Sequence, residues 1–205
     1  MNIILQTETA VVLYAGEALA LTEAGATNGD WFDDKSTTAN CTLVEGVELP
    51  AAWCGQHYTY IDGVWGLTAQ GTAAQAAQLA TASADLVLQI DADTDAIYQQ
   101  VIGNRAAEYT VAEAEALAYA DAGYTGTVPA SVASWATAKG WAAQAAADDI
   151  IATATAWRTA QAAIRAARLL RKEQARTAVD LAALATTRAQ WAGFVAAIRG
   201  QLGVG

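Results

Sequence analysis

The pattern of hydrophobic and polar positions changes near residue 70. Before it, short runs rich in β-branched and aromatic residues are separated by polar ones, as is typical of strands. Residues 2–5, 10–14 and 41–44 are three such runs. After it, alanine, glutamine and threonine dominate, and this composition favours helices. We therefore predict an α+β fold, with a small N-terminal antiparallel β module (residues 1–69) followed by a mainly α-helical region with long C-terminal helices (residues 70–205).

A tight hairpin is the clearest local feature of the predicted β module. Residues 57–61 and 64–67 are apolar runs, and Asp62-Gly63 lies between them. An Asp-Gly pair in this position favours a two-residue turn, because both central residues of that turn need positive φ. The sequence therefore predicts two antiparallel strands joined at this pair.

Acidic residues indicate one helix start in the C-terminal region. Asp91, Asp93 and Asp95 precede an apolar run. Acids at the beginning of a helix interact favourably with its dipole, so we predict that a helix begins there. The Ala-rich residues 72–84 then form a separate connector helix, and a third helix is predicted at residues 107–121.

Glycine and proline divide the remainder of the chain. Residues 123–129 form a predicted loop, and Pro129 or Thr127 is expected to open the next helix, since proline is tolerated in a first helical turn. Gly140 is expected to end that helix. Residues after 141 lack proline, which predicts one long helix or two antiparallel ones.

Two apolar stripes run along the predicted C-terminal helices. In the first, Ile150, Trp157 and Ile164 recur every seven residues. The second has the three-and-four spacing of a coiled-coil seam, and its members are Leu181, Leu184, Arg188, Trp191, Val195, Ile198 and Leu202. Residues 168–176 place polar side chains on the seam, so the helix is expected to change its contact face or turn back there. The stripes pack either within the chain or against another copy, and the second stripe is our candidate oligomer or partner interface.

Charge is distributed unevenly along the chain. The formal net charge is −10, which argues against binding to nucleic acid or to anionic membranes, because phosphates would repel the protein. Residues 151–205 carry +6, whereas residues 1–150 carry −16. Opposite charges favour docking between the two parts, within one chain or between copies. The alternative is that the basic residues form a solvated helix face.

Patterns for catalysis and metal binding are weak. The aspartate run resembles the start of a calcium loop, but Ala96 and Ile102 stand where that loop needs glycine and glutamate. His57 is the single histidine, and its place at the start of a strand favours an ordinary cross-strand role. Neither a glycine-rich phosphate-binding motif nor a supported carboxylate pair occurs. We therefore expect no enzyme activity, no catalytic or cofactor-binding residue and no metal.

Cysteine usage and hydropathy give expectations about location. Cys41 and Cys54 lack the spacing of a metal or redox motif, so reduced thiols are expected. The sequence has neither a secretory signal pattern nor 18 uninterrupted apolar residues, so synthesis in a cytoplasm without membrane insertion is expected.

Seven tryptophans supply bulk that alanine lacks. Their plain role is core packing. Neighbours on one face of the hairpin could instead align as a carbohydrate-stacking platform, and the candidate surface-binding aromatics are Trp53, Tyr58, Tyr60 and Trp65.

Two groups of residues resemble proteins of tailed bacteriophages. The first is similar to the end of a small β module in many phage proteins encoded beside tail-fibre genes, and consists of Leu49-Pro50, Gly55, Tyr58, Tyr60 and Asp62-Gly63-Val64-Trp65. The second is similar to the helical part of such proteins, and consists of residues 105–109, 123–129, 146–149 and 157–165. Together they span residue 49 to about residue 200.

The resemblance implies a non-enzymatic protein of the phage tail. The expected function is a structural component of the virion, in the fibre or spike apparatus, that forms homo-oligomers and contacts other tail proteins. One alternative is a tail-fibre assembly chaperone that is not retained in the virion. Another is a host-glycan-binding module that uses the hairpin aromatics.

Overall fold

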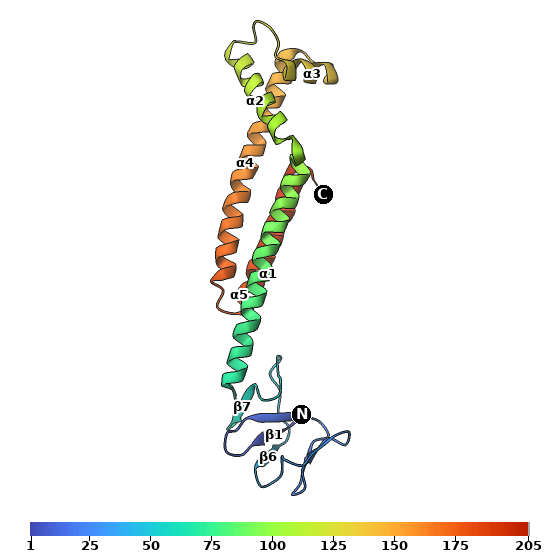
Figure 1. Ribbon diagram of the computed structural model, residues 1–205, viewed down its shortest axis with the longest axis vertical. Helices are drawn as coiled ribbons and strands as arrows, with labels where there is room; N and C mark the ends of the chain where they lie inside the picture. The colour runs from blue at the N-terminus through green and yellow to red at the C-terminus, as the bar shows by residue number, and fades with distance from the viewer. Residues whose placement is uncertain (205) are drawn as a thin grey trace. The chain divides into compact units, whose positions relative to one another are not determined.

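Short antiparallel strands make up the N-terminal part of the structure, a computed structural model that describes residues 1–204 (Figure 1). The strands are β1 (Asn2–Gln6), β2 (Val12–Gly16), β3 (Ala20–Leu21), β4 (Ala26–Thr27), β5 (Phe32–Asp33), β6 (Cys41–Val44), β7 (Tyr58–Ile61) and β8 (Val64–Leu67). They form three sheets with the orders β2-β1-β6, β3-β4-β5 and β7-β8. Together with the helices that follow, they confirm the predicted α+β fold class.

The β2-β1-β6 sheet buries side chains on both faces. Successive residues of a strand point to opposite faces. Ile3 and Leu5 of β1 accordingly join a cluster with Tyr60 and Trp65 of the β7-β8 hairpin. Ile4, on the opposite face, joins the cluster that contains side chains of the β3-β4-β5 sheet. The small module thus has two hydrophobic layers, which explains why β1 is apolar at three consecutive positions.

The predicted hairpin is confirmed. Asp62 has φ of 50° and Gly63 has φ of 84°, as a two-residue turn with two positive φ angles requires. Tyr60 and Trp65 lie directly opposite each other on the two strands, and their ring centroids are 4.8 Å apart. The turn chemistry and this aromatic pair together set the register of the two strands.

Helix α1 (Ala69–Val101) starts against the hairpin. The Thr68 hydroxyl accepts a hydrogen bond from the Gly71 N–H and donates one to the Gln56 carbonyl. Gly71 is in close contact with the backbone, because a Cβ built on it would lie 2.1 Å from the His57 carbonyl oxygen. A hydrogen atom at this position is therefore what lets the first turn approach the β module.

Replacing Gly71 with alanine is expected to lower the free energy of unfolding by about 1–3 kcal/mol, because the new methyl group overlaps a carbonyl that cannot move easily. The matched control is Gly193→Ala, where the methyl group would meet nothing within 4 Å and helix propensity favours alanine. Denaturant unfolding of both variants measures the difference. Equal stabilities for the two variants would contradict the close approach at Gly71.

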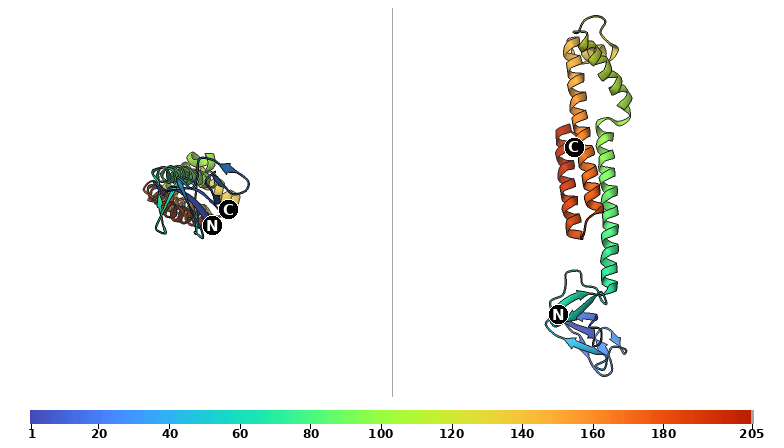
Figure 2. Two further views of the ribbon diagram at one scale, coloured as in Figure 1. Left: turned by 90° about the horizontal axis from the view of Figure 1, so that it is seen from below. Right: turned by 90° about the vertical axis from the view of Figure 1, so that its left-hand side faces the viewer.

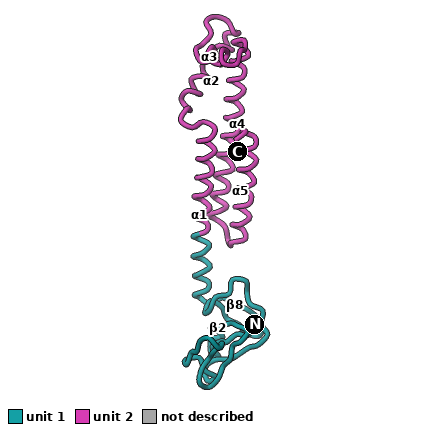
Figure 3. Tube along the Cα trace, turned by 90° about the vertical axis from the view of Figure 1, so that its right-hand side faces the viewer, with its two compact units in different colours: residues 1–81 teal, residues 82–205 magenta. Residues whose placement is uncertain are grey.

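Five α-helices follow the hairpin in the part of the chain that the structure describes. After α1 come α2 (Ala106–Asp121), α3 (Ala130–Lys139), α4 (Ala143–Arg176) and α5 (Leu181–Leu202), with a 3₁₀ turn at Gly103–Arg105. The chain divides into two compact units between Thr81 and Ala82 (Figure 3). The strands end at Leu67, two residues before the predicted boundary at residue 69, whereas the division of the compact units falls within α1.

One helix start predicted from sequence is wrong. The aspartate run at residues 91–95 does not open a helix, because α1 continues without interruption from Ala69 to Val101. Of the two alternatives for residues 168–176, a reversal of the chain is not observed, since α4 is helical to Arg176. The chain reverses after that residue, and Asp180 caps α5 by accepting a hydrogen bond from the Ala183 N–H at 2.7 Å. Other boundaries are confirmed: the 107–121 helix is α2, Pro129 precedes α3, and Gly140 ends α3 with φ of 68°.

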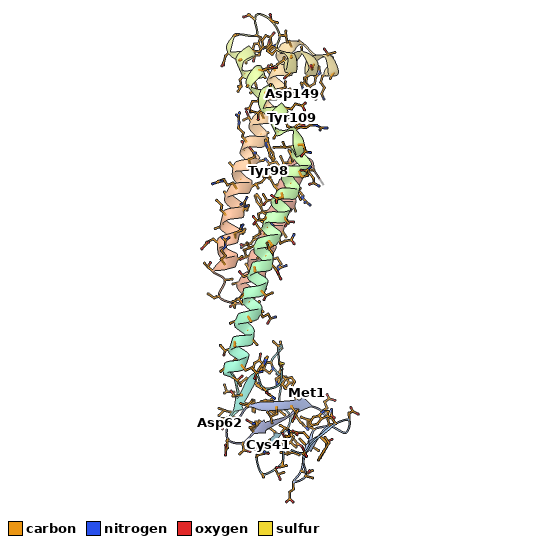
Figure 4. All side chains as sticks on the ribbon, viewed as in Figure 1. Met1, Cys41, Asp62, Tyr98, Tyr109 and Asp149 are labelled. Carbon is orange, nitrogen blue, oxygen red and sulfur yellow. The ribbon has the colours of Figure 1, made fainter. Side chains whose placement is uncertain are left out.

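The helical unit (residues 82–204) has two packed regions. In the first, α2 and α3 cover the N-terminal part of α4, with Ala116, Tyr119, Val132, Ala146 and Ala147 buried among them. In the second, the C-terminal half of α1 lies beside α4 and α5 (Figures 1 and 2). The fully buried large side chains of these helices are Leu86, Ile90, Ile97, Ile164 and Trp191. Tyr98 of α1, labelled in Figure 4, meets Trp157 of α4 edge to face, with ring centroids 5.3 Å apart.

Candidate functional site

The predicted α5 stripe is used mainly inside the chain. Leu184, Trp191, Val195 and Ile198 are buried in this single chain, so in this conformation they do not form a surface that a partner reaches. Their spacing was correctly interpreted as a packing stripe, and of the two readings the structure places these four in the intramolecular core. The other three differ: Leu181 and Arg188 are exposed, and Leu202 is half-buried.

The predicted hairpin aromatics pack into the β module. Tyr58 is buried, and the rings of Tyr58 and Tyr60 both contact Trp65. The Trp65 indole N–H donates to the Glu48 carbonyl at 3.0 Å, and Trp53 lies against the same cluster. Trp53, Tyr60 and Trp65 are half-buried, and their part in core packing competes with a role as a stacking platform. The large apolar side chains that are exposed on the hairpin are Ile61, Val64 and Leu67.

A cluster of charged and polar groups connects α1, α4 and α5. The Asp91 carboxylate of α1 pairs with both Arg168 and Lys172 of α4. Two residues further along α1, Asp93 accepts a hydrogen bond from the Trp191 indole N–H of α5 at 2.8 Å. Two of the three aspartates predicted as a helix start, Asp91 and Asp93, are therefore interhelical partners, whereas Asp95 is exposed.

The polar residues on the α4 seam, Arg171 and Gln174, have side-chain partners. The Arg171 guanidinium donates to the side-chain oxygens of Gln174 on α4 and of Gln190 on α5. The seam therefore continues through residues 168–176 as a polar layer within a continuous helix. The sequence signal for this layer was present in the spacing, but Gln190 lies on another helix.

Opposite charges meet within the chain, as one of the two charge readings predicts. Glu113 of α2 pairs with Arg158 of α4, and Asp91 pairs with Arg168 and Lys172. Each contact joins an acid from residues 1–150 to a base from residues 151–205. The Lys172 side chain is 13% exposed, so this pair is screened less than the others.

A polar contact anchors the start of α3. The Glu115 carboxylate of α2 accepts a hydrogen bond from the Ser131 N–H at 2.8 Å. The backbone N–H and the hydroxyl of Ser131 lower the pKa of Glu115 below its ordinary value, because they stabilise the ionised form. A first-turn N–H of α3, which has no partner within the helix, is satisfied in this way.

The stabilisation by Glu115 is expected to depend on pH. Since the pKa is lowered in the folded state, the contribution is present above the ordinary pKa of 4.5 and is lost as pH falls through the folded value. We expect the difference in unfolding free energy between the natural chain and Glu115→Gln to shrink between pH 7 and acid pH, as measured by denaturant titration. Glu108→Gln on the same helix is the control, and an equal pH effect in both variants would argue against the Ser131 contact.

Aromatic side chains are exposed where α3 meets α4. Lys139 lies over the rings of Trp135 and Trp141, at 4.7 and 5.4 Å from their centres. The Trp135 indole N–H donates to Asp149, whose position on α4 is labelled in Figure 4. Sequence reasoning assigned these tryptophans to the helices without identifying this surface, because the lysine and the carboxylate are brought together only by the turn at Gly140.

The buried and exposed thiols of the β module are distinct. Cys41, labelled in Figure 4, is buried in β6, and Cys54 is exposed. Both thiols are free.

A hydrogen bond joins two sheets of the β module. The Tyr14 hydroxyl donates to the Asp33 carboxylate at 2.9 Å, which helps to close the β3-β4-β5 sheet onto β2. The pKa of Asp33 is lowered mainly by a hydrogen bond from Ser36, with further donors at Lys35 and Tyr14.

Among residues 1–204, no group of three histidine, cysteine, aspartate or glutamate side chains is arranged to hold a metal ion. Within the same residues, no helix combines the length and the apolar character that a membrane crossing requires.

Two surface hollows lie in the helical unit. A groove of about 370 Å³ runs between α1 and α5, and a smaller one of about 200 Å³ lies between α1 and α4.

Comparison of the chain with protein-family models, with curated proteins and with solved structures finds no match.

Proposed function

We propose that this protein is a non-enzymatic structural component of a bacteriophage tail, part of the fibre or spike apparatus of the virion. The observation that supports it is the role of the residues that resemble tail-associated proteins. Leu49 packs in the core, Tyr60 packs on Trp65, and Asp62-Gly63 forms the turn. All of them build the fold, which is what a structural module of an assembly would require.

The charged residues support the same proposal. Three acidic side chains of the helical unit each contact a side chain of another helix. They are Asp91, Asp93 and Glu113. Groups held in this way position helices, and a general acid or base needs a carboxylate that faces a substrate. The helical unit also exposes large apolar side chains on separate helices, such as Leu88, Val111 and Leu169, which suits contact with other proteins of the tail.

Quantitative mass spectrometry of purified phage particles tests the proposal. Particles are separated from the lysate on a density gradient, and the amount of this chain is compared with that of a major tail protein. We expect a fixed ratio between the two across preparations. A host cytoplasmic protein of similar abundance in the lysate serves as the control for carry-over.

The alternatives give different results in the same experiment. An assembly chaperone is present in the lysate, co-purifies with a fibre protein and is missing from finished particles, and that outcome would reject the virion proposal. A glycan-binding module loses ligand binding on a glycan array when Trp65 is replaced with alanine. No binding before or after that change removes the glycan alternative.

A further inference from the structure

The groove between α1 and α5 has an apolar strip between two arginines. The side chains that a partner can reach in the strip are the exposed Ala192 and Ala196 of α5, and Arg188 and Arg199 of α5 line the same groove. The two arginines are 11 residues apart, so they project from α5 within about 20° of each other and about 16 Å apart along the helix. Asp93 of α1 also lines the groove, but its carboxylate already accepts hydrogen bonds from the side chains of Gln89 and Trp191.

Neither arginine of the groove has an anionic partner within residues 1–204. Arg188 is exposed and Arg199 is half-buried. A carboxylate from outside the chain can form a charge-assisted hydrogen bond with each of these guanidinium groups. The groove is thus shaped for an acidic, partly apolar occupant.

The outer face of α1 carries the complementary pattern. Asp85, Leu88, Ala92 and Asp95, here termed the α1 ridge, are all exposed and point away from the buried side of the helix. Leu88 is 67% exposed, although Leu86 and Ile90 beside it are fully buried. The two aspartates are 10 residues apart, about 15 Å along the helix, and neither forms an ion pair among the described residues.

The ridge and the groove agree in charge, spacing and polarity. Two acids about 15 Å apart match two bases about 16 Å apart, and the apolar residues between the acids match the exposed alanines between the bases. The acids in the middle of α2 do not offer the same match, because Glu113 already pairs with Arg158 and Glu115 already binds Ser131.

We propose that the α1–α5 groove of one chain binds the α1 ridge of a second copy of the same chain. Ridge and groove adjoin on α1, so two chains with antiparallel α1 helices can each place a ridge in the groove of the other. The contact is then two-fold symmetric and closes at a dimer. This inference rests on the proposed structural function for its biological use, and it identifies the surface on which that function would depend.

The test uses the purified full chain and two charge-reversed variants. In the groove variant, Arg188→Glu is combined with Arg199→Glu, and in the ridge variant, Asp85→Arg is combined with Asp95→Arg. Each variant alone places like charges opposite one another, so we expect the dimer dissociation constant to rise at least about 100-fold. An equal mixture of the two variants restores opposite charges at both contacts, and we expect a heterodimer with near-natural affinity. Sedimentation and light scattering measure the masses, and far-UV circular dichroism shows that each variant is folded.

The matched control is Arg105→Glu combined with Arg165→Glu, which changes the net charge by the same amount as the groove variant, at exposed positions outside the groove. Its dimerisation should be unchanged. A second variant, Leu88→Ser, removes the largest apolar side chain of the ridge without changing charge and should weaken the dimer about tenfold.

Three results would each overturn the inference: a natural chain that stays monomeric at high micromolar concentration, a mixture that fails to form the heterodimer, or a control that weakens association as much as the groove variant. Because the test needs no phage particle, its result is separate from the proteomic test of the proposed function. A dimer that forms as described while the chain is missing from virions would retain this contact and reject only the tail assignment.

Discussion

Replacing Trp191 with alanine is expected to lower the free energy of unfolding of the helical unit by about 3–5 kcal/mol. The indole is 2% exposed, stacks with Phe194 and donates to Asp93, so its loss creates a cavity and leaves a carboxylate without its donor. Denaturant unfolding followed by far-UV circular dichroism measures the change, because the helices dominate that signal.

Two further substitutions separate packing from hydrogen bonding at this position. Trp191→Phe retains much of the ring volume but removes the N–H, so a smaller loss of about 1–2 kcal/mol is expected. Trp141→Ala is the control, because that side chain is 43% exposed, and its removal should cost less than about 1 kcal/mol. A Trp191→Ala variant as stable as the Trp141→Ala variant would contradict the burial of α5 against α1 and α4.

Replacing Asp91 with alanine is expected to destabilise the helical unit by about 2–3 kcal/mol, and to do so more than its partial exposure alone would predict. The reason is that Lys172, with a side chain 13% exposed, loses the carboxylate that compensates its burial, and Arg168 loses the same partner. The measurement is again the free energy of unfolding from denaturant titration.

The double variant Asp91→Asn with Lys172→Met tests the cause. If an uncompensated charge is responsible, the double variant should be more stable than Asp91→Ala, since it leaves no unpaired ammonium. Glu173→Ala is the surface control, because Glu173 and Arg176 are both more than half exposed, and its effect should be within about 0.5 kcal/mol. A double variant that is less stable than Asp91→Ala would show that the ion pair contributes more than relief of burial.

Elements specified by short segments of the chain were predictable. The hairpin follows from Asp62-Gly63, whose φ angles only a few residue types tolerate, and the end of α3 follows from Gly140 for the same reason. The strand at Cys41–Val44 was predicted with its observed bounds, because β-branched and apolar residues are bounded there by polar ones. These signals act within a few residues of where they occur.

Features specified by distant residues were missed or misplaced. Asp91 was interpreted as part of a helix start because acids favour that position, but its partners on α4 are about 80 residues away in sequence. The polar residues around Arg171 looked like an interruption for the same reason, since Gln190 could not be assigned as a partner. The two-residue strands β3, β4 and β5 are too short to show a period.

The candidate interfaces were also predicted only in part, because the sequence indicates a packed face but not what covers it. The spacing of Leu184, Trp191 and Val195 correctly indicated a packed face, but spacing does not distinguish a neighbouring helix of the same chain from one of another copy. The pairing of Trp65 with Tyr60 likewise follows from the hairpin register, whereas the coverage of both rings by the sheet core depends on residues from β1 and β2.

The unequal accessibility of the two cysteines makes the β module a built-in reporter of its own opening. A thiol reagent reaches Cys54 directly, whereas Cys41 reacts only when β6 separates from the layer that covers it. Modification of Cys54 therefore gives the total amount of protein, and the rate of modification of Cys41 measures how often the module opens under native conditions. Labelling kinetics can thus follow the local stability of this small module within the intact chain, without an added probe.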